Sequence, residues 1–259
     1  MNFLLQSKNQ SLDIDTRILE NELRMQKRLH SYKIIKKDFI DNCDASDLEI
    51  KQSVPVGDLD FVSLFLQKIH GVKNMNPIEV PEVLRRDEFL KREYSIVEKK
   101  DLPKRGRYFT KYVSKLKVFS HTGLIETLQY EEEGKEPFLK DGLYQVSEVV
   151  DIVAEYRCFI HNNKLIAINY YDGDCTIYPD STLIKKAILM YQMDPDRPAA
   201  YTMDIAVIRD RGTAILEIHP WVSVGLYGYV FGSSLPYCYR DGFRWYVEKN
   251  KEINKSSNF

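Results

Sequence analysis

Two apolar runs in the C-terminal half of the chain each carry a carboxylate. They are TMDIAVI at residues 202–208 and ILEIHP at residues 215–220. A hairpin loop at residues 209–212 would pair the runs and place Asp204 opposite Glu217. Two carboxylates facing each other in a sheet repel. Either a divalent cation compensates, as Mg²⁺ does when it binds one or two protein carboxylates, or this face is open to solvent and has no function.

The proposed pairing also predicts which face of the hairpin is core. With Ile208 opposite Thr213, one face is wholly apolar and carries the following residues: Met203, Ile205, Val207, Ala214, Leu216 and Ile218. The opposite face carries Asp204, Glu217 and, two residues further on, His219. His219 is then either a third metal ligand or a structural hydrogen-bonding group.

Cationic side chains occur upstream at positions that could face the same site. Lys111 lies in the middle of the strand-like RYFTKYVSK, with Lys115 and Lys117 close behind, and Arg157 shares a strand face with Glu155. Each alone could be a solvated charge, but cations together with a carboxylate pair are what a nucleoside triphosphate with Mg²⁺ requires. Neither GxxxxGK[ST] nor GxGxxG occurs, which excludes the P-loop and Rossmann solutions.

The elements that would position these residues fall into two groups. Residues 1 to about 75 predict a small α/β lobe, with strands at 3–5 and 32–40 and a helix at 17–29. A second helix in this lobe begins after Asp58 as N-cap and ends at Gly71. Two prolines in NMNPIEVPEVLRR indicate a connector to a second part of the chain.

The second part reads mainly as strands and hairpins. The sequence predicts strands at 108–113 and 143–150 and a helix at 182–193. EYRCFIHNNKLIAINYY is a clear hairpin, with Asn162 and Asn163 as a two-residue turn that tolerates positive φ. Together with the hairpin at residues 209–212, this pattern indicates an α+β fold.

Composition narrows the class of protein. The chain has 259 residues, of which 44% are hydrophobic and 29% charged, typical of a globular protein with a substantial core. A net charge of −1 argues against nucleic acid as a partner. No apolar run is long enough for a membrane span, and no signal peptide is evident. Four widely spaced cysteines without a CxxC pair predict reduced thiols and a cytoplasmic protein.

The order of these segments resembles the ATP-grasp superfamily, and within it a clade of small phage and bacterial proteins named for one arginine and two lysines. The resemblance covers roughly residues 54–229. It rests on VPVGDLDFV, YFTKYVSKLKVF, YQVSEVV, AEYRCFI, YYDGD, YTMDIAVI and LEIHPWVSVGLYGY, in this order. It implies an α+β ATP-grasp fold in which two α+β subdomains clasp ATP, preceded by an α/β lobe. The expected domains are 1–75 and 76–259.

The resemblance also implies roles for the basic residues. Lys111 would reach the ATP phosphates, with Lys117 as a second cation from the same region. Arg157 would face phosphate or a substrate carboxylate, and Glu155 would orient it. The loop at residues 223–228 would close the substrate side.

The remaining implied roles concern adenine and the metal. Glu148 and the backbone of Val149 and Val150 would form a hinge along adenine, and Asp204 and Glu217 would hold Mg²⁺. ATP-grasp enzymes usually end this motif as E-x-N, whereas this chain has His219 in the third position. Imidazole prefers softer metals, so His219 could bind Mn²⁺, bind no metal, or donate to phosphate.

Three hypotheses follow. The leading one is an ATP-dependent ligase that joins a carboxylate to an amine or thiol through an acylphosphate, with small-molecule or peptide substrates such as amino acids. A second is a catalytically inactive ATP-binding module that acts through a protein partner, which the His219 departure favours. A third is an adaptor that binds no nucleotide. The oligomeric state is not assigned.

Overall fold

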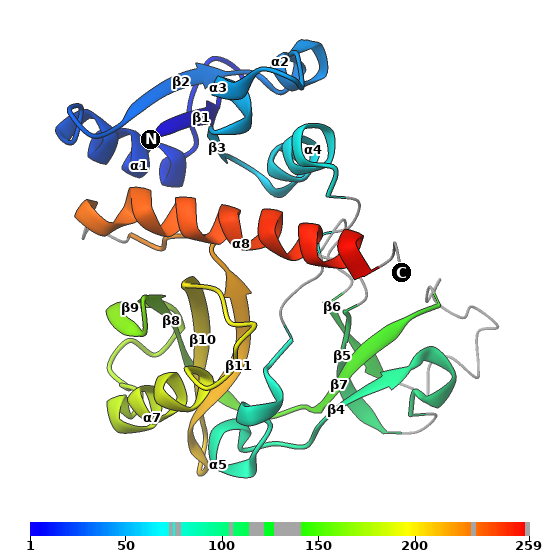
Figure 1. The fold of residues 1–259 in the computed structure, drawn as a ribbon. Coiled ribbons are helices and arrows are strands. Elements are labelled where there is room, and N and C mark those ends of the chain that lie inside the picture. Colours follow the sequence, from blue (N-terminus) through cyan, green and yellow to red (C-terminus); the bar gives the residue numbers. More distant parts are fainter. Residues whose placement is uncertain are drawn as a thin grey trace.

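The computed structural model describes residues 1–72, 75, 79–103, 106–113, 122–126, 141–228 and 232–256. The N-terminal part forms a three-stranded parallel sheet of β1 (Asn2–Gln6), β2 (Ser31–Ile35) and β3 (Val54–Val56), in the order β2-β1-β3. Four helices accompany it: α1 (Ile14–Met25), α2 (Lys37–Asn42), α3 (Leu48–Lys51) and α4 (Leu59–His70). The predicted α/β elements are therefore present (Figure 1).

Local signals set most boundaries in this part. Asp58 caps α4 by accepting from Phe61 N at 2.7 Å, and Gly71 ends the helix with a φ of 65°, as predicted. Helix α1 starts earlier than residue 17 because Asp13 caps it and accepts from Thr16 N at 2.8 Å. The prediction of strand at residues 36–40 was wrong, because this segment turns into α2.

The second sheet is antiparallel and follows two short helices, η1 (Glu82–Leu84) and α5 (Asp87–Leu90). Its strands are β4 (Tyr94–Glu98), β5 (Arg107–Tyr112), β6 (Thr122–Glu126) and β7 (Leu143–Glu148), in the order β4-β7-β5-β6, with η2 (Lys99–Asp101) after β4. Lys111 lies on β5 directly opposite Gln145 of β7.

The third sheet is also antiparallel, with the order β11-β10-β8-β9. It contains β8 (Ile152–His161), β9 (Lys164–Gly173), β10 (Ala200–Ile208) and β11 (Gly212–Pro220). Asn162 and Asn163 form the predicted β8–β9 turn with φ values of 49° and 63°. Helix α7 (Ser181–Tyr191) packs Ile184, Ala187 and Ile188 against one face of this sheet.

A β-bulge in the β10–β11 hairpin changes the predicted register. Near the turn, Ile208 pairs with Gly212 rather than with Thr213, and Ile205 pairs with Ile215. The register then shifts, so that Asp204 faces Glu217 as predicted, with Leu216 as the extra residue. Without this shift, Leu216 would face Asp204 and Glu217 would turn to the core face.

The bulge also corrects the predicted apolar face. Ile215, rather than Ala214 or Leu216, packs in the core beneath α7. Ala214 and Leu216 instead lie with Ala206 and Ile208, on the same face of the sheet as Asp204. This face is therefore apolar near the β10–β11 turn and charged further along.

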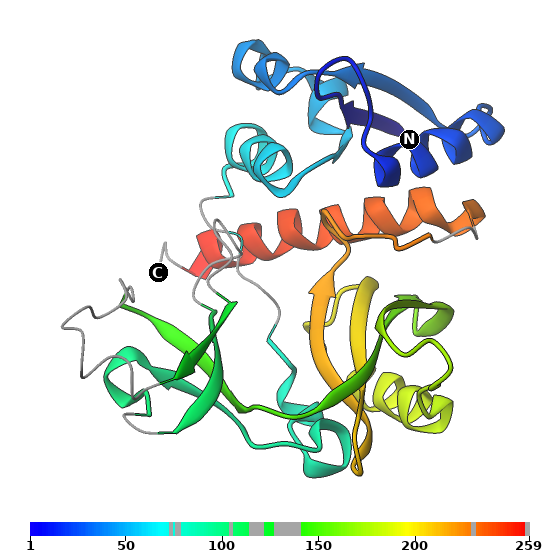
Figure 2. The ribbon, with the colours of Figure 1, turned by 180° about the vertical axis from the view of Figure 1, so that it is seen from behind.

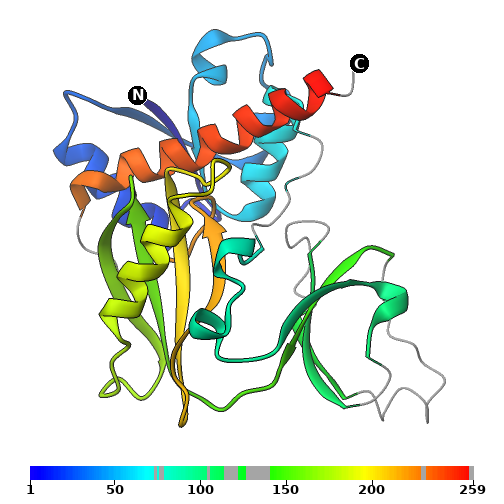
Figure 3. The ribbon, with the colours of Figure 1, turned by 60° about the horizontal axis from the view of Figure 1, so that its bottom comes forward.

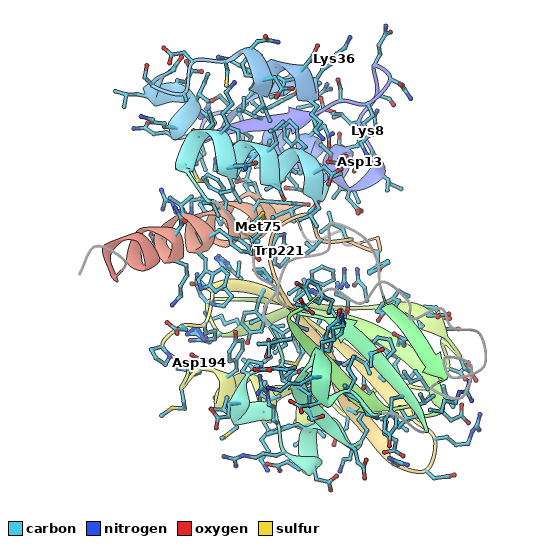
Figure 4. The ribbon with its side chains drawn as sticks, turned by 90° about the vertical axis from the view of Figure 1, so that its right-hand side faces the viewer. Lys8, Asp13, Lys36, Met75, Asp194 and Trp221 are labelled. Carbon is cyan, nitrogen blue, oxygen red and sulfur yellow. The ribbon has the colours of Figure 1, made fainter. Side chains whose placement is uncertain are left out.

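The long helix α8 (Leu235–Ser256), preceded by η3 (Gly232–Ser234), has no counterpart among the predicted elements. It runs between the N-terminal lobe and the third sheet (Figures 1 and 2). Trp221, which is completely buried, lies at this level, as does Met75 (Figure 4). One core joins β1, α4, α8 and Trp221, and the division between residues 75 and 76 stays a prediction.

Helix α8 owes its close approach to a glycine. A Cβ at Gly242 would lie 2.2 Å from the backbone oxygen of Trp221. Among the described residues, no helix is both long and apolar enough to cross a membrane.

Candidate functional site

A cavity of about 610 Å³ lies between the two antiparallel sheets, whose strands face each other across it (Figure 3). Charged side chains reach it from both sheets, and Leu59 at the start of α4 adds a contact from the N-terminal lobe. The charged residues that line it include Arg92, Lys111, Glu148, Glu155, Arg157, Asp204, Glu217 and His219. The fold thus collects in one place every described residue that the sequence assigned to the site.

Five of these side chains form a row of alternating charge. Lys111 Nζ lies 3.0 Å from Glu217 Oε2, so this ion pair joins the second sheet to the third. His219 Nε2 lies 2.8 Å from the same Glu217 oxygen and 3.6 Å from Asp204 Oδ2. Arg157 binds Asp204 in a bidentate manner, through Nε and Nη2 at 2.7 Å each. The order is therefore cation, carboxylate, imidazole, carboxylate, cation.

Burial and these contacts act in opposite directions on the row. Burial alone would raise the pKa of Glu217, but hydrogen bonds from His219 and Lys111 outweigh it and lower that pKa. Burial would likewise raise the pKa of Asp204, and contacts with Arg157 and His219 hold it below its usual value. For His219, burial would lower the pKa, whereas the two carboxylates raise it. Both carboxylates are therefore ionised, and the imidazole between them favours its protonated form.

The same three central residues fit a divalent cation. Asp204, Glu217 and His219 each offer a ligand atom, and these atoms lie within 4.8 Å of one another. Carboxylate oxygens suit Mg²⁺, and imidazole suits Mn²⁺ better. The predicted repulsion between Asp204 and Glu217 is compensated here by the protein's own cations, so a metal is compatible with the site but is not needed to balance it.

The prediction that Glu155 orients Arg157 was wrong. Arg157 is held by Asp204 and donates its Nη1 to the Gly225 carbonyl at 3.1 Å. The Glu155 carboxylate instead accepts from the Tyr171 hydroxyl at 2.6 Å. The reason is geometric: Arg157 lies directly opposite Asp204 on the neighbouring strand, whereas Glu155 lies opposite Ala206.

The segment at residues 223–228 connects the N-terminal lobe to the cavity. Ser223 Oγ donates to the Gly57 carbonyl at 2.6 Å. Tyr227 has a positive φ of 48°, and its ring stacks on Tyr171 at a centroid distance of 4.7 Å. The Arg157 guanidinium lies 4.8 Å from the Tyr227 ring centroid. This segment therefore covers Arg157 from the side of the N-terminal lobe.

Comparison with known families accounts for this geometry. Residues 89–232, more than half of the chain, match a family described as an ATP-grasp domain, the second family of its clade. The chain belongs to this ATP-grasp family. No curated protein matches it significantly in sequence.

Solved structures agree on the ATP-grasp fold. D-cycloserine synthetase DcsG superposes with a TM-score of 0.59 at 10% identity, covering 96% of this chain and 100% of that one. The ATP-grasp ligase PsnB complexed with minimal precursor gives 0.51 at 11% identity, with coverages of 92% and 97%. Macrocyclase MdnC from Microcystis aeruginosa MRC, bound with precursor peptide MdnA, gives 0.50 at 14%, with 93% and 98%. At these identities the likeness concerns the fold.

The predicted hinge of the ATP-grasp domain lies where β7 passes into β8. Glu148, Val149 and Val150 all line the cavity at this crossing. Glu148 is bound by Arg211 through two contacts of 2.8 and 2.6 Å, which lower its pKa. Their role along adenine stays a prediction, as do those of the other site residues. Lys117 lies outside the described residues.

Sequence reasoning missed Arg92 and the tyrosine pair at the cavity. Arg92 is only 8% exposed and lines the wall next to Leu216 and Glu217. No local pattern marks it, because it follows a four-residue helix and makes its contacts with β11, far along the chain. Tyr171 could have been found, since it shares a face with Glu155 and Arg157 near the end of the predicted hairpin.

Proposed function

We propose that this ATP-grasp protein is an ATP-dependent ligase that joins a carboxylate to an amine or a thiol. The observation that carries the proposal is the alternating row from Lys111 to Arg157, in a cavity between two sheets that meet at a hinge. The structural neighbours that are named as ligases or synthetases support the same class of reaction.

The cavity has distinct ends for the two parts of ATP. Near the hinge, Val150, Ile152 and Leu216 provide apolar surface for adenine. At the other end, Lys111 and Arg157 provide cations for the phosphates, and Asp204, Glu217 and His219 would hold Mg²⁺ or Mn²⁺. Such an ion supplies charge neutralisation on the transferred phosphoryl group.

The reaction would proceed in two steps. The substrate carboxylate attacks the γ-phosphorus, which forms an acylphosphate and releases ADP. The amine or thiol then attacks the acyl carbon, and inorganic phosphate leaves as the carbon–oxygen bond breaks. The protein positions the reactants and neutralises charge, and no nucleophile from the chain is required. Candidate substrates are small carboxylates and amines, including amino acids and peptides.

ADP release tests the proposal. Purified protein would be incubated with ATP, Mg²⁺ or Mn²⁺, and a panel of amino acids and dipeptides, with hydroxylamine added to intercept any acylphosphate as a hydroxamate. We expect ADP and hydroxamate to form together with at least one carboxylate. ATP binding without ADP release across the whole panel would contradict a ligase that uses these substrate classes.

A second candidate is an ATP-binding module without ligase activity. His219 favours it, because a protonated imidazole between Asp204 and Glu217 opposes a metal at the same place. Such a module would bind ATP to the same extent with and without EDTA. The ligase, in contrast, should bind ATP more tightly when the divalent cation is present.

A further inference from the structure

We propose that Arg92 is a positioning residue that holds the β-bulge of β11 and thereby keeps Glu217 opposite Asp204 in the cavity. Its effect on ligand binding rests on the proposed function, in which Glu217 holds the metal. Its effect on the strand itself does not depend on that function.

Arg92 is placed to serve the bulge and little else. Its Nη1 donates to the Ile215 carbonyl at 2.7 Å and to the Leu90 carbonyl at 3.1 Å. Its Nη2 donates to the Leu216 carbonyl at 3.2 Å. Among the described residues, no carboxylate forms an ion pair with this guanidinium, although Glu148 and Glu217 line the same cavity.

The bulge creates a need for such a donor. An extra residue in one strand interrupts the ladder of backbone hydrogen bonds, and buried carbonyls without partners are costly. Ile215 and Leu216 are the two residues at the shift of register. A planar guanidinium presents two donors side by side, which matches two consecutive carbonyls better than a single ammonium does.

The bulge in turn decides where Glu217 points. On the turn side of the shift, Ile205 pairs with Ile215; on the other side, Asp204 pairs with Glu217. If the ladder ran on without the shift, Glu217 would pair with Met203 and turn toward the core beneath α7. Stabilising the bulge therefore keeps the Glu217 carboxylate, and His219 two residues on, in the cavity.

A different role for Arg92 makes different demands. As a cavity-lining cation it could bind phosphate directly, and its positive charge would then be the essential property. Arg92→Met removes donors and charge, whereas Arg92→Lys keeps the charge but loses the paired donors. Arg85→Met is the control, because Arg85 donates to the Val80 carbonyl at 2.7 Å and touches no part of the bulge.

Two measurements decide between these roles. The first is amide hydrogen exchange across residues 213–219 in metal-free protein, and the second is Mn²⁺ affinity measured by electron paramagnetic resonance with ADP present. We expect Arg92→Met to lose exchange protection selectively in this strand and to weaken Mn²⁺ binding about 10- to 100-fold, as loss of a residue that orients a ligand does. Arg92→Lys should behave like Arg92→Met, and Arg85→Met like wild type.

Other outcomes would overturn the proposal. Unchanged exchange in Arg92→Met, a loss of protection spread over the whole chain with normal Mn²⁺ affinity, or full recovery of Mn²⁺ binding in Arg92→Lys would each do so. If Arg92→Met does not fold, the exchange pattern of Arg92→Lys decides. If wild type binds neither Mn²⁺ nor ADP, the proposed function is wrong, and hydrogen exchange still decides the role of Arg92.

Discussion

At the scale of single residues, the site is balanced by its own charges. His219 lies between Asp204 and Glu217 and occupies the place where a divalent cation would neutralise both carboxylates. Proton and metal therefore compete for one position, because only the neutral imidazole can coordinate. This competition makes the departure from the usual asparagine measurable.

We expect stability and metal binding to depend on pH in opposite directions. The carboxylates raise the folded pKa of His219, so its stabilisation is complete below the unfolded pKa of about 6.5 and is lost as pH rises through the raised value. Metal affinity should increase over the same range as the proton leaves. Thermal unfolding in EDTA and Mg²⁺-dependent ATP turnover, each followed against pH, test this.

His219→Asn is the matched variant for this prediction. Asparagine keeps a polar side chain without a titrating group, so both pH profiles should flatten between about 6.5 and 8.5. Mn²⁺ should favour wild type more than the variant, since imidazole suits the softer ion. If the profiles of the two proteins superimpose, His219 is neither a metal ligand nor a cation for the carboxylates.

Lys111 offers a second residue-scale prediction. Its side chain is 8% exposed, and its contact with Glu217 joins the two sheets. Lys111→Met keeps the aliphatic volume but removes the charge, and a charge-assisted contact with phosphate is worth about 1.5–3 kcal/mol. ATP binding should therefore weaken by about 10- to 150-fold in calorimetry, with the circular dichroism spectrum unchanged. Wild-type affinity would remove Lys111 from the phosphate site.

At the scale of elements, short-range chemistry sets where helices and turns begin. Asp58 accepts from Phe61 N, pairs with Lys8 at 2.7 Å, and accepts from Gln6 at 3.2 Å. The cap also fixes the start of α4, where Leu59 reaches the cavity. One side chain thus links a helix terminus to the wall of the site.

Asp58→Ala should lower the free energy of unfolding by about 1 kcal/mol, the usual cost of losing an N-cap. Asp58→Asn retains an oxygen that can cap α4 and loses mainly the pair with the exposed Lys8, which is worth little. Chemical denaturation of the three proteins compares these effects. Equal losses in both variants would show that the charge, rather than the cap, matters here.

At the scale of the whole molecule, one core joins parts of the chain that are far apart in sequence. Phe3, Phe65, Trp221 and Phe243 are all buried in it, so the N-terminal lobe and α8 share their apolar contacts. Because α8 begins soon after the segment at residues 223–228, packing in this core also fixes that segment over the cavity.

Gly242→Ala tests how closely α8 must approach. In an exposed helix, replacing glycine by alanine stabilises by about 1 kcal/mol. Here the new Cβ would lie 2.2 Å from Trp221 O, so the helix must move and the change should destabilise. Thermal unfolding should show a lower midpoint for Gly242→Ala, and little change for Arg244→Ala on the exposed side of the same helix. A raised midpoint for Gly242→Ala would contradict this packing.

The sequence alone determined the features that depend on neighbouring residues. Asn162 and Asn163 predicted the β8–β9 turn, Asp58 and Gly71 predicted the ends of α4, and alternation predicted that Asp204 would face Glu217. Each follows from backbone preferences or side-chain periodicity within one element or hairpin. Helix α8 carries a comparable signal, although no helix was predicted there, in the spacing of Leu235, Cys238, Tyr239, Phe243 and Tyr246.

Only the tertiary structure decided which charges meet. Lys111 reaches Glu217 across two sheets, Arg157 binds Asp204 rather than associating with Glu155, and Arg92 donates to carbonyls more than a hundred residues away. The bulge at Leu216 was equally invisible, because one extra residue leaves the alternation on either side of it intact. Contacts between distant segments depend on how sheets pack and where strands shift register, and periodicity along the chain does not carry that information.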